Sequence, residues 1–384
     1  MDYAVLVSGG VDSAVALHTL RRQGISSIRA YYLKIWLEDD LSFLGNCPWE
    51  EDLRYARDVC AAAKVPLEVI PLQQEYYDRV VSYTLEELRN GFTPSPDIFC
   101  NQRIKFGAFF DAIGGSTDRI ATGHYAGLER VEGAPVRLML APDPVKDQTY
   151  FLSHLSQEQL SRAEFPLGSM TKEQVRVRAA ELDLSNKDRP DSQGICFLGR
   201  IRYPDFVRHY LGSKDGPIID DGTGAELGRH NGAWFYTIGQ RQGLGLGNGP
   251  WYVTGRDIDS NVITVTHGTA VAARAKNTFT IGDLTWTSGA PAVRRDGDAP
   301  RISDSSFRDT IVGDAIRLKA KIRHGPALTG CTVERLDGTS FADATRLRVT
   351  MDEADRGVAP GQFAVLYDPP YCLGAGKILP GAAR

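Results

Sequence analysis

Hydrophobic positions in the first 200 or so residues alternate between short, continuous apolar runs and longer stretches with helical spacing. The short runs predict buried strands, and apolar side chains at every third or fourth position predict amphipathic helices. The predicted strands are Tyr3–Val7, Ile28–Ile35, Leu67–Ile70 and Arg119–Thr122, and the predicted helices are Asp12–Gln23, Glu50–Lys64 and Gln74–Asn90. Strands that alternate with helices of this length indicate a parallel sheet covered by helices on both faces.

The pattern changes after about residue 200, where glycine becomes frequent and short β-like runs replace the helical spacing. The predicted strands in this part are Trp251–Val253, Val262–Thr266, Phe279–Ile281, Ile316–Ile322, Arg346–Met351 and Phe363–Tyr367. We therefore predict an α/β fold with three domains: a parallel-sheet catalytic domain over residues 1–205, a small central linking domain over 206–275, and an all-β barrel over 276–384.

The segment from Ile316 to Arg323 alternates strictly between apolar and basic residues. In a strand this places Arg317, Lys319, Lys321 and Arg323 on one face. A solvated strand face is the simpler interpretation. Four like charges repel one another, however, so we favour a surface that binds the phosphate backbone of a nucleic acid.

Composition and charge limit the classes of protein to consider. The chain has 384 residues, of which 42% are hydrophobic and 24% charged, so it can bury cores and is not a disordered tail. The net charge of −4 means that any nucleic-acid site is a local patch. No apolar run approaches the ~18 residues that span a bilayer. The N-terminus lacks the features of a signal or transit peptide. We expect a cytoplasmic monomer, with a mitochondrion or plastid after presequence removal as the alternative location.

The six cysteines are far apart and form no Cys-x-x-Cys pair. This argues against a zinc ribbon and against an iron–sulfur cluster held by a compact motif. The histidines show no ligand spacing either, and we predict no protein-bound zinc. In a chain without an export signal the thiols stay reduced unless the chemistry oxidises them.

The hexapeptide Ser8-Gly9-Gly10-Val11-Asp12-Ser13 lies between the first predicted strand and the first predicted helix. Glycines let the backbone approach an anion, and the N–H groups at a helix N-terminus point toward it. A turn capped by Asp12 would be the simpler interpretation, since aspartate is a good N-cap. No Gly-Lys-Ser/Thr follows, so the loop is not a Walker A motif. It resembles the pyrophosphate loop of the PP-loop ATPase superfamily, which implies adenylation of a substrate with release of pyrophosphate.

Two cysteines lie in unusual surroundings. Cys100 follows two prolines and lies three residues after Asp97, so a helical turn would place the thiol and the carboxylate on one face. Asp97 is then either an N-cap or a general acid/base beside a nucleophile. A thiol at a helix start near Lys105 would be reactive. Cys196 lies between Ile195 and Phe197, which fits a buried structural thiol, but the polar stretch from Asp191 to Gly194 fits a loop that positions it.

Several motifs together resemble the tRNA-specific 2-thiouridylase family of the MnmA/TrmU type, over essentially the full chain. They occur in the family's order. The motifs are the loop at residues 8–13, the Pro-Asp-x-x-Cys-Asn segment at 96–101 with Ile104-Lys105-Phe106, Ala121–Tyr125, Lys146–Leu152, Asp191–Phe197, Tyr236–Gly245 and, more weakly, Pro360–Tyr367.

The resemblance implies ATP-dependent thiolation of C2 of the wobble uridine in tRNA. Cys196 would carry a persulfide, Cys100 would be the nucleophile that releases its sulfur, and Asp97 would be the acid/base residue. A transient disulfide between the two cysteines is expected after transfer. The implied ATP-binding residues are Leu6, Val7, Ser8, Gly9, Gly10, Val11, Asp12, Ser13, Leu33 and Gly123. The implied tRNA contacts are Ser95, Pro96, Asp97, His124, Lys146, Asp147, Gln148 and Gln362, to which the charge pattern adds Arg317, Lys319, Lys321 and Arg323.

The implied small molecules are ATP and Mg2+, with Asp12 the one suggested metal contact. The implied partners are the tRNAs for Lys, Glu and Gln and a sulfur-relay protein or cysteine desulfurase. The chain departs from the family at Ser95, which replaces an asparagine, and at Leu33, which replaces a methionine. The alternatives are another PP-loop adenylating enzyme, a catalytically inactive RNA-binding protein, and a zinc- or cluster-dependent thiolase.

Overall fold

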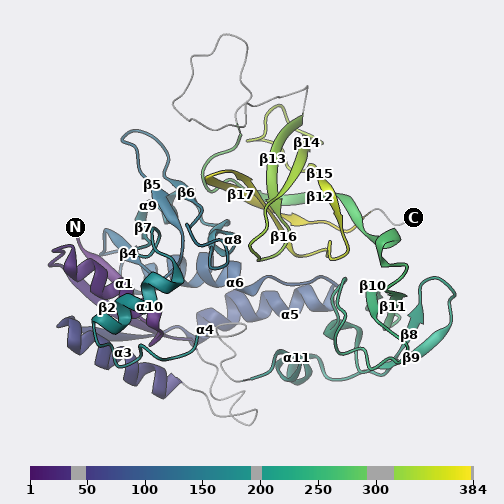
Figure 1. The fold of residues 1–384 in the computed structure, drawn as a ribbon, viewed down its shortest axis with the longest axis horizontal. Helices are drawn as coiled ribbons and strands as arrows, with labels where there is room; N and C mark the ends of the chain where they lie inside the picture. Colours follow the sequence, from purple (N-terminus) through teal and green to yellow (C-terminus); the bar gives the residue numbers. More distant parts are fainter. Residues whose placement is uncertain (36–48, 192–200, 292–314, 382–384) are drawn as a thin grey trace.

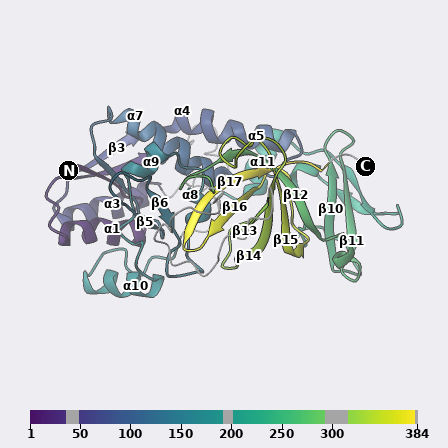
Figure 2. The same cartoon turned by 90° about the horizontal axis from the view of Figure 1, so that it is seen from above.

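A computed structural model describes residues 1–35, 49–191, 201–291 and 315–381. The parallel-sheet domain and the central domain lie at opposite ends of the molecule, and the barrel lies above the space between them (Figure 1). The view from above shows the same linear arrangement, with the barrel in the middle (Figure 2). No helix within the described ranges is long and apolar enough to cross a membrane.

The first domain is built on a parallel sheet with strand order β3-β2-β1-β4-β7. Alternate residues from Ala4 to Val7, in β1 and just after it, point to opposite faces: Ala4 and Leu6 belong to one core cluster, and Val5 and Val7 to another. Both faces are therefore buried, as the sequence predicted. The strands are β1 (Tyr3–Leu6), β2 (Ile28–Lys34), β3 (Leu67–Pro71), β4 (Arg119–Ala121) and β7 (Ala163–Glu164).

Helices cover the two faces of this sheet. One face packs on α1 (Val11–Arg22), α3 (Trp49–Ala63) and α10 (Lys172–Glu181). The other packs on two long helical segments, each with a wider π-helical stretch in its middle. These are α4 (Gln73–Tyr76), η2 (Tyr77–Val81) and α5 (Ser82–Arg89), and then α6 (Pro96–Phe99), η3 (Cys100–Ala108) and α7 (Phe109–Ala112). The short helices α8 (Thr149–Leu152) and α9 (Gln157–Arg162) follow.

The central domain is a four-stranded sheet of order β10-β11-β8-β9, preceded by helix α11 (Tyr203–Leu211). Ile218, Val253, Ile263 and Val265 form its small core. The strands are β8 (Gly216–Asp220), β9 (Glu226–His230), β10 (Trp251–Asp257) and β11 (Val262–His267).

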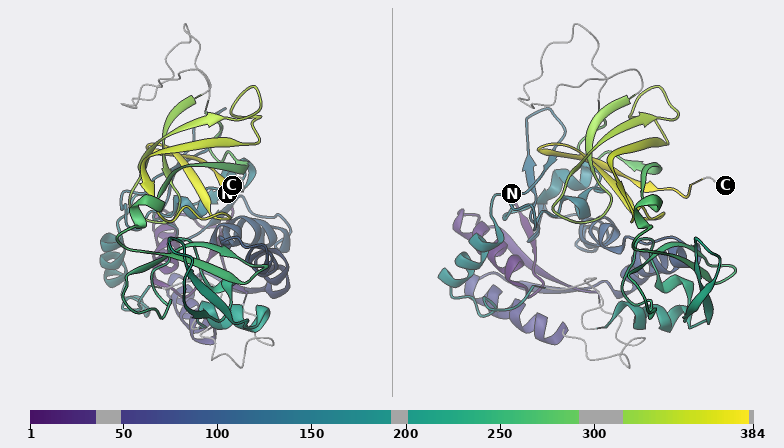
Figure 3. Two further views of the ribbon diagram at one scale, coloured as in Figure 1. Left: turned by 90° about the vertical axis from the view of Figure 1, so that its right-hand side faces the viewer. Right: turned by 45° about the vertical axis from the view of Figure 1, so that its right-hand side comes forward.

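The C-terminal domain is a closed antiparallel barrel. Its strands follow the order β12-β15-β14-β13-β16-β17, and β12 also pairs with β17, which closes the sheet. A hairpin from the first domain, β5 (Gly127–Glu129) and β6 (Arg137–Met139), extends the barrel sheet beyond β17. The barrel strands are β12 (Lys276–Thr285), β13 (Ala315–Lys321), β14 (Thr329–Arg335), β15 (Leu347–Asp355), β16 (Phe363–Asp368) and β17 (Tyr371–Ile378). The rotated views show the barrel above both other domains (Figure 3).

The basic segment from Ile316 to Arg323, most of which is β13, corrects one expectation. Its apolar residues are buried as predicted, but its cations do not form a single exposed face. Lys321 is only 4% exposed and pairs with the buried carboxylate of Asp147 at 2.9 Å. Arg317 makes two bonds to Asp352 of β15, at 2.8 and 2.7 Å, and Arg323 binds Asp355 at 2.8 and 2.6 Å. Neighbouring acids therefore neutralise much of the charge that the sequence pattern assigned to RNA.

Candidate active site

The phosphate-binding loop lies at the carboxyl edge of the parallel sheet, between β1 and α1. Gly9 has a φ of 79°, and a Cβ there would lie 2.3 Å from the carbonyl oxygen of Asp52, so only glycine fits. The Ser8 N–H donates to Ser13 Oγ at 3.2 Å, and Ser13 Oγ donates to the Gly10 carbonyl at 3.0 Å. Gly10, not Asp12, occupies the N-cap position of α1. The interpretation of Asp12 as the cap is therefore wrong, and the first turn of α1 can bind an anion.

The other predicted ATP-site residues surround this loop. Leu6 ends β1, Val7 follows it, and Leu33 lies near the end of β2. A Cβ on Gly123, just after β4, would lie 2.7 Å from the backbone nitrogen of Ser13. Strand order reverses between β1 and β4, and open parallel sheets bind ligands at such a point. The structure therefore brings these predicted residues together.

Residues that the sequence analysis missed hold the loop in place through hydrogen bonds to its backbone. Asn186 Nδ2 donates to the Gly9 carbonyl at 2.9 Å, and Arg189 donates to the same oxygen at 3.2 Å. Arg189 also pairs with Asp52, whose carbonyl oxygen leaves no room for a Cβ on Gly9. These polar residues carry no recognisable spacing from the loop, so only the fold identifies them.

An ion network continues from the loop. Lys172 Nζ lies 2.7 Å from Asp12 Oδ1 and 2.7 Å from Asp191 Oδ1. The Tyr125 hydroxyl donates to Asp12 at 2.8 Å, and burial together with the Asp12 charge raises the pKa of Tyr125. Partial burial alone would raise the pKa of Asp191, but hydrogen bonds from Lys146 and Lys172 outweigh it and lower that pKa to about 2. Asp191 is therefore ionised at any physiological pH.

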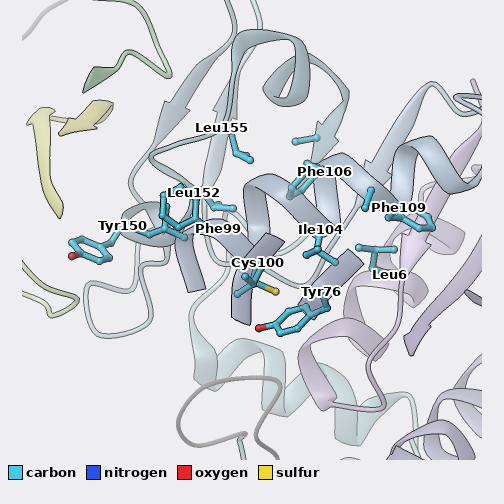
Figure 4. Packing of buried hydrophobic residues seen from close by; sticks show 14 of the residues in the cluster. Leu6, Tyr76, Phe99, Cys100, Ile104, Phe106, Phe109, Tyr150, Leu152 and Leu155 are labelled. Carbon is cyan, nitrogen blue, oxygen red and sulfur yellow. The ribbon is translucent and has the colours of Figure 1, made fainter. Parts of the chain in front are cut away.

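Cys100 is the first residue of η3 and is only 2% exposed. Its side chain lies within the apolar cluster of the first domain and points to the same side as Tyr76 in the close-up view (Figure 4). Asp97 lies one turn earlier, in α6, as the spacing predicted. Ser95 occupies the N-cap position of α6, so the interpretation of Asp97 as a cap is wrong. Lys105 Nζ, which the sequence placed beside the thiol, donates to Asn101 Oδ1 at 2.9 Å.

The predicted carrier of the persulfide, Cys196, lies outside the residues that the structure describes. Asp191, at the start of the same motif, is the last described residue before it.

A cavity of about 300 Å³ lies where the three domains meet. It brings together five predicted tRNA contacts: Ser95, Pro96 and Asp97 from the first domain, and Arg323 and Gln362 from the barrel. Its remaining lining includes Leu88, Thr93, Pro94, Ile98, Tyr150, Phe151, Tyr203, Trp234, Phe235, Thr237 and His324.

Close backbone contacts fix this junction. The Thr93 N–H donates to the Pro360 carbonyl at 2.8 Å, and Gly361 has a φ of 92° where a Cβ would lie 2.6 Å from Phe92. From the central domain, Arg256 donates to the Gly91 carbonyl and to Thr93 Oγ1, both at 3.1 Å. Burial lowers the pKa of Arg256 to about 10, so it stays charged at neutral pH.

Aromatic side chains form much of the cavity wall. His324 stacks on Phe151 with ring centroids 4.7 Å apart and an interplanar angle of 22°. Trp234 and Phe235 enter from a short helical turn of the central domain, η4 (Ala233–Phe235). Aromatic walls beside a cation are typical of sites that hold unstacked bases of single-stranded RNA.

The other predicted tRNA contacts do not line this cavity, although His324, which does, lies 3.2 Å from the Asp147 carbonyl. His124 is buried beside Thr122 at 2.7 Å, and burial, with the Lys105 charge, holds its pKa well below the ordinary value. Asp147 and Lys321 are buried with each other. These three side chains are buried in the structure, and their contact with RNA stays a prediction. The Gln148 side chain accepts the Tyr125 N–H at 2.9 Å, and Lys146 binds Asp191. Arg317 and Lys319 lie on β13.

Within the described ranges, no group of three or more His, Cys, Asp or Glu side chains is arranged to hold a metal ion. One carboxylate, Asp12, lies at the phosphate loop. One carboxylate with substrate phosphates is a common way for proteins to hold Mg2+.

Three family models match the chain in sequence order. They are described as a tRNA methyl transferase HUP domain over residues 1–200, a tRNA methyl transferase PRC-barrel domain over 204–267 and an aminomethyltransferase beta-barrel domain over 277–378. Among solved structures, the U34-tRNA thiolase NcsA from Methanococcus maripaludis is similar, with 15% identity, a TM-score of 0.33 and coverage of 55% of this chain and 66% of that chain. A likeness this weak supports no inference about chemistry.

Curated relatives match over their whole length. The tRNA-specific 2-thiouridylase MnmA of Porphyromonas gingivalis (strain ATCC BAA-308 / W83) is 41% identical over 385 residues, covering 99% of this chain and 100% of that protein. The tRNA-specific 2-thiouridylase MnmA 1 of Bacteroides thetaiotaomicron is 40% identical over 380 residues, covering 98% of this chain and 99% of that protein. With all three family models and full-length identity of this degree, the chain belongs to the tRNA-specific 2-thiouridylase MnmA family.

Proposed function

We propose that the protein is a tRNA-uridine 2-sulfurtransferase that replaces O2 of the wobble uridine with sulfur at the expense of ATP. The observation that carries this proposal is the placement of Cys100 and Asp97 one helical turn apart. Asp97 also lines the cavity between the three domains, whose aromatic walls suit a nucleobase. The names of the full-length relatives and the phosphate loop support the same reaction.

In the first step the loop at residues 8–13 binds the phosphates of ATP, with Gly123 and Leu33 beside the nucleotide. ATP would transfer its adenylyl group to the uridine O2 and release pyrophosphate, which makes that oxygen a leaving group. Mg2+ would be held by phosphate oxygens and by Asp12. Lys172 offsets the negative charge of Asp12, which would otherwise repel the phosphates.

In the second step Cys196 delivers sulfur as a persulfide. Its terminal sulfur attacks C2 of the uridine, and AMP departs with the former O2. The Cys100 thiolate then attacks the Cys196 sulfur, which forms a disulfide and leaves the thiocarbonyl on the base. Asp97 is positioned to act as the acid/base residue that accepts or donates a proton in these reaction steps.

The cavity at the domain junction is the proposed seat of the wobble base. Ser95, Pro96 and Asp97 contact it, and Arg323 and Gln362 hold adjacent RNA from the barrel. Residues 1–205, 206–275 and 276–384 would act as catalytic, linking and tRNA-gripping units. The proposed substrates are the tRNAs for Lys, Glu and Gln, and a persulfide-bearing relay protein or cysteine desulfurase supplies the sulfur.

Nucleoside mass spectrometry tests the proposal directly. Unmodified tRNA is incubated with the protein, Mg-ATP and a persulfide donor, and 2-thiouridine is measured. The expected result is a signal that requires ATP. Release of pyrophosphate without 2-thiouridine would contradict the proposal and indicate a different adenylated substrate.

Two buried cysteines of the first domain provide a matched pair of variants. We predict that Cys100→Ser abolishes thiolation while the dissociation constant for tRNA changes little. Cys60→Ser makes the same chemical change in α3, where burial raises the pKa of the thiol to about 12 and keeps it protonated. This control should retain thiolation. Loss of tRNA binding in Cys100→Ser would assign Cys100 a structural role instead.

A further inference from the structure

We propose that Asp191 couples the ATP site to the tRNA site so that each ligand weakens binding of the other. The reason is that this one carboxylate is the counter-ion of a lysine at each site. This inference rests on the proposed function. The Oδ1 atom of Asp191 accepts from Lys172 at 2.7 Å and from Arg176 at 2.6 Å, and its Oδ2 atom accepts from Lys146 at 2.7 Å.

The first of these lysines belongs to the nucleotide site. Lys172 is the first residue of α10 and bridges Asp191 to Asp12 of the phosphate loop, at 2.7 Å from each. Its side chain is only 14% exposed, so screening by solvent is weak. Phosphates bound at the loop would attract this ammonium group and weaken its pairing with Asp191.

The second lysine belongs to the segment assigned to tRNA. Lys146 is 37% exposed and faces solvent as well as Asp191. The neighbouring residue Asp147 joins this segment to the barrel through its bond to Lys321. An RNA phosphate that recruits Lys146 must draw it away from Asp191.

Arg176 keeps the shared carboxylate in place. Its Nη1 atom donates to the carbonyls of Lys187 at 2.9 Å and Arg189 at 2.7 Å, while Nη2 holds Asp191. Asp191 therefore stays fixed while either lysine changes partner.

The two lysines compete for one negative charge, which gives the coupling its sign. When ATP attracts Lys172, the Asp191 charge is left to Lys146 and Arg176, and Lys146 becomes less available to RNA. By thermodynamic reciprocity, tRNA must weaken ATP binding by the same factor. The two ligands are thus antagonistic, and departure of pyrophosphate and AMP relieves the antagonism.

The experiment measures the dissociation constant of an unmodified tRNA transcript with and without a saturating non-hydrolysable ATP analogue and Mg2+. For the wild-type protein we expect the analogue to weaken tRNA binding about fivefold or more. In Asp191→Asn the ratio of the tRNA dissociation constants measured with and without the analogue should fall to about one. Each ligand alone should bind this variant at least as tightly as wild type, because both lysines lose a competing carboxylate. A merely structural Asp191 would instead weaken both.

Two further variants keep the outcome decisive. Lys146→Gln removes the other half of the pair, so it should bind tRNA more weakly and also lose the coupling. Asp183→Asn removes an exposed carboxylate paired with Lys187 and should keep the wild-type ratio. A ratio of one in the wild-type protein, or the wild-type ratio in Asp191→Asn, overturns this inference but leaves the proposed function intact. Absence of tRNA binding to the wild-type protein overturns the proposed function as well.

Discussion

His154 shows how burial fixes the charge state of a single side chain. It lies between Phe99 and Phe363, with ring centroids 5.6 and 5.1 Å away, and its Nε2 atom lies 3.2 Å from Thr285 Oγ1. Burial, with the nearby Arg103 charge, lowers its pKa from 6.5 to about 4. The histidine is therefore neutral at the contact between the first domain and the barrel.

This shift predicts a pH dependence of stability. Below about pH 6.5 His154 is protonated in the unfolded chain, whereas in the folded protein it stays neutral down to about pH 4. The free energy of unfolding should therefore fall as the pH drops through this window. His154→Phe keeps a ring in place and should flatten part of that fall in urea titrations at several pH values. Parallel pH profiles for the two proteins would contradict the prediction.

At the scale of elements, the turn between β1 and α1 is the most constrained part of the site. Gly9 and Gly24 have similar φ values, 79° and 82°, but their surroundings differ. A Cβ on Gly9 would collide with the Asp52 backbone, whereas a Cβ on Gly24 would have no atom within 4 Å.

Comparing the variants Gly9→Ala and Gly24→Ala separates the effect of backbone strain on stability from the effect of loop displacement on ATP binding. Both variants should lose about 1–2 kcal/mol of stability from a left-handed alanine. Only Gly9→Ala must also move the loop, so its ATP affinity should fall ~tenfold or more in calorimetric titrations. Equal ATP affinities would show that the loop tolerates the displacement.

Local pattern predicted most elements of the first domain to within one or two residues, from Tyr3 to Ala121, because buried strands and amphipathic helices carry clear periodicities. Beyond a turn at Asp97, it did not predict the helical segment from Pro96 to Ala112, although it predicted the segment from Gln73 to Arg89, which also has a π-helical middle. It also missed the short hairpin β5–β6, whose strands pair with the distant β17. Strands that short depend on tertiary partners.

At the scale of the whole molecule, a buried ion pair joins the barrel to the first domain. Lys321 and Asp147 are 2% and 1% exposed at their side chains. Asp147 also accepts from the Ala141 N–H at 3.1 Å and from Thr149 Oγ1. The alternation in β13 predicted which residues face the core, but no local pattern could show that Lys321 meets a carboxylate 174 positions earlier.

Replacing one member of this pair should be far more damaging than breaking a surface pair on the same strand. Lys321→Met leaves Asp147 without its buried counter-ion and should cost about 3–5 kcal/mol. Arg317→Met breaks the exposed pair with Asp352 and should cost about 1 kcal/mol or less. Urea unfolding measures both changes. Asp147→Asn should restore part of the stability lost in Lys321→Met, and no recovery would argue against a charge effect.

The hairpin β5–β6 has a consequence for how the chain is made. Its second strand, β6, ends at Met139, but the partner of β6, β17, begins only at Tyr371. At a synthesis rate of roughly 5–20 residues per second, the ribosome needs roughly ten to fifty seconds to cover that interval. During this time the nascent first domain presents an unpaired strand edge, which is open to pairing with other chains. Completion of the last strand therefore ends a period of aggregation risk as well as closing the barrel.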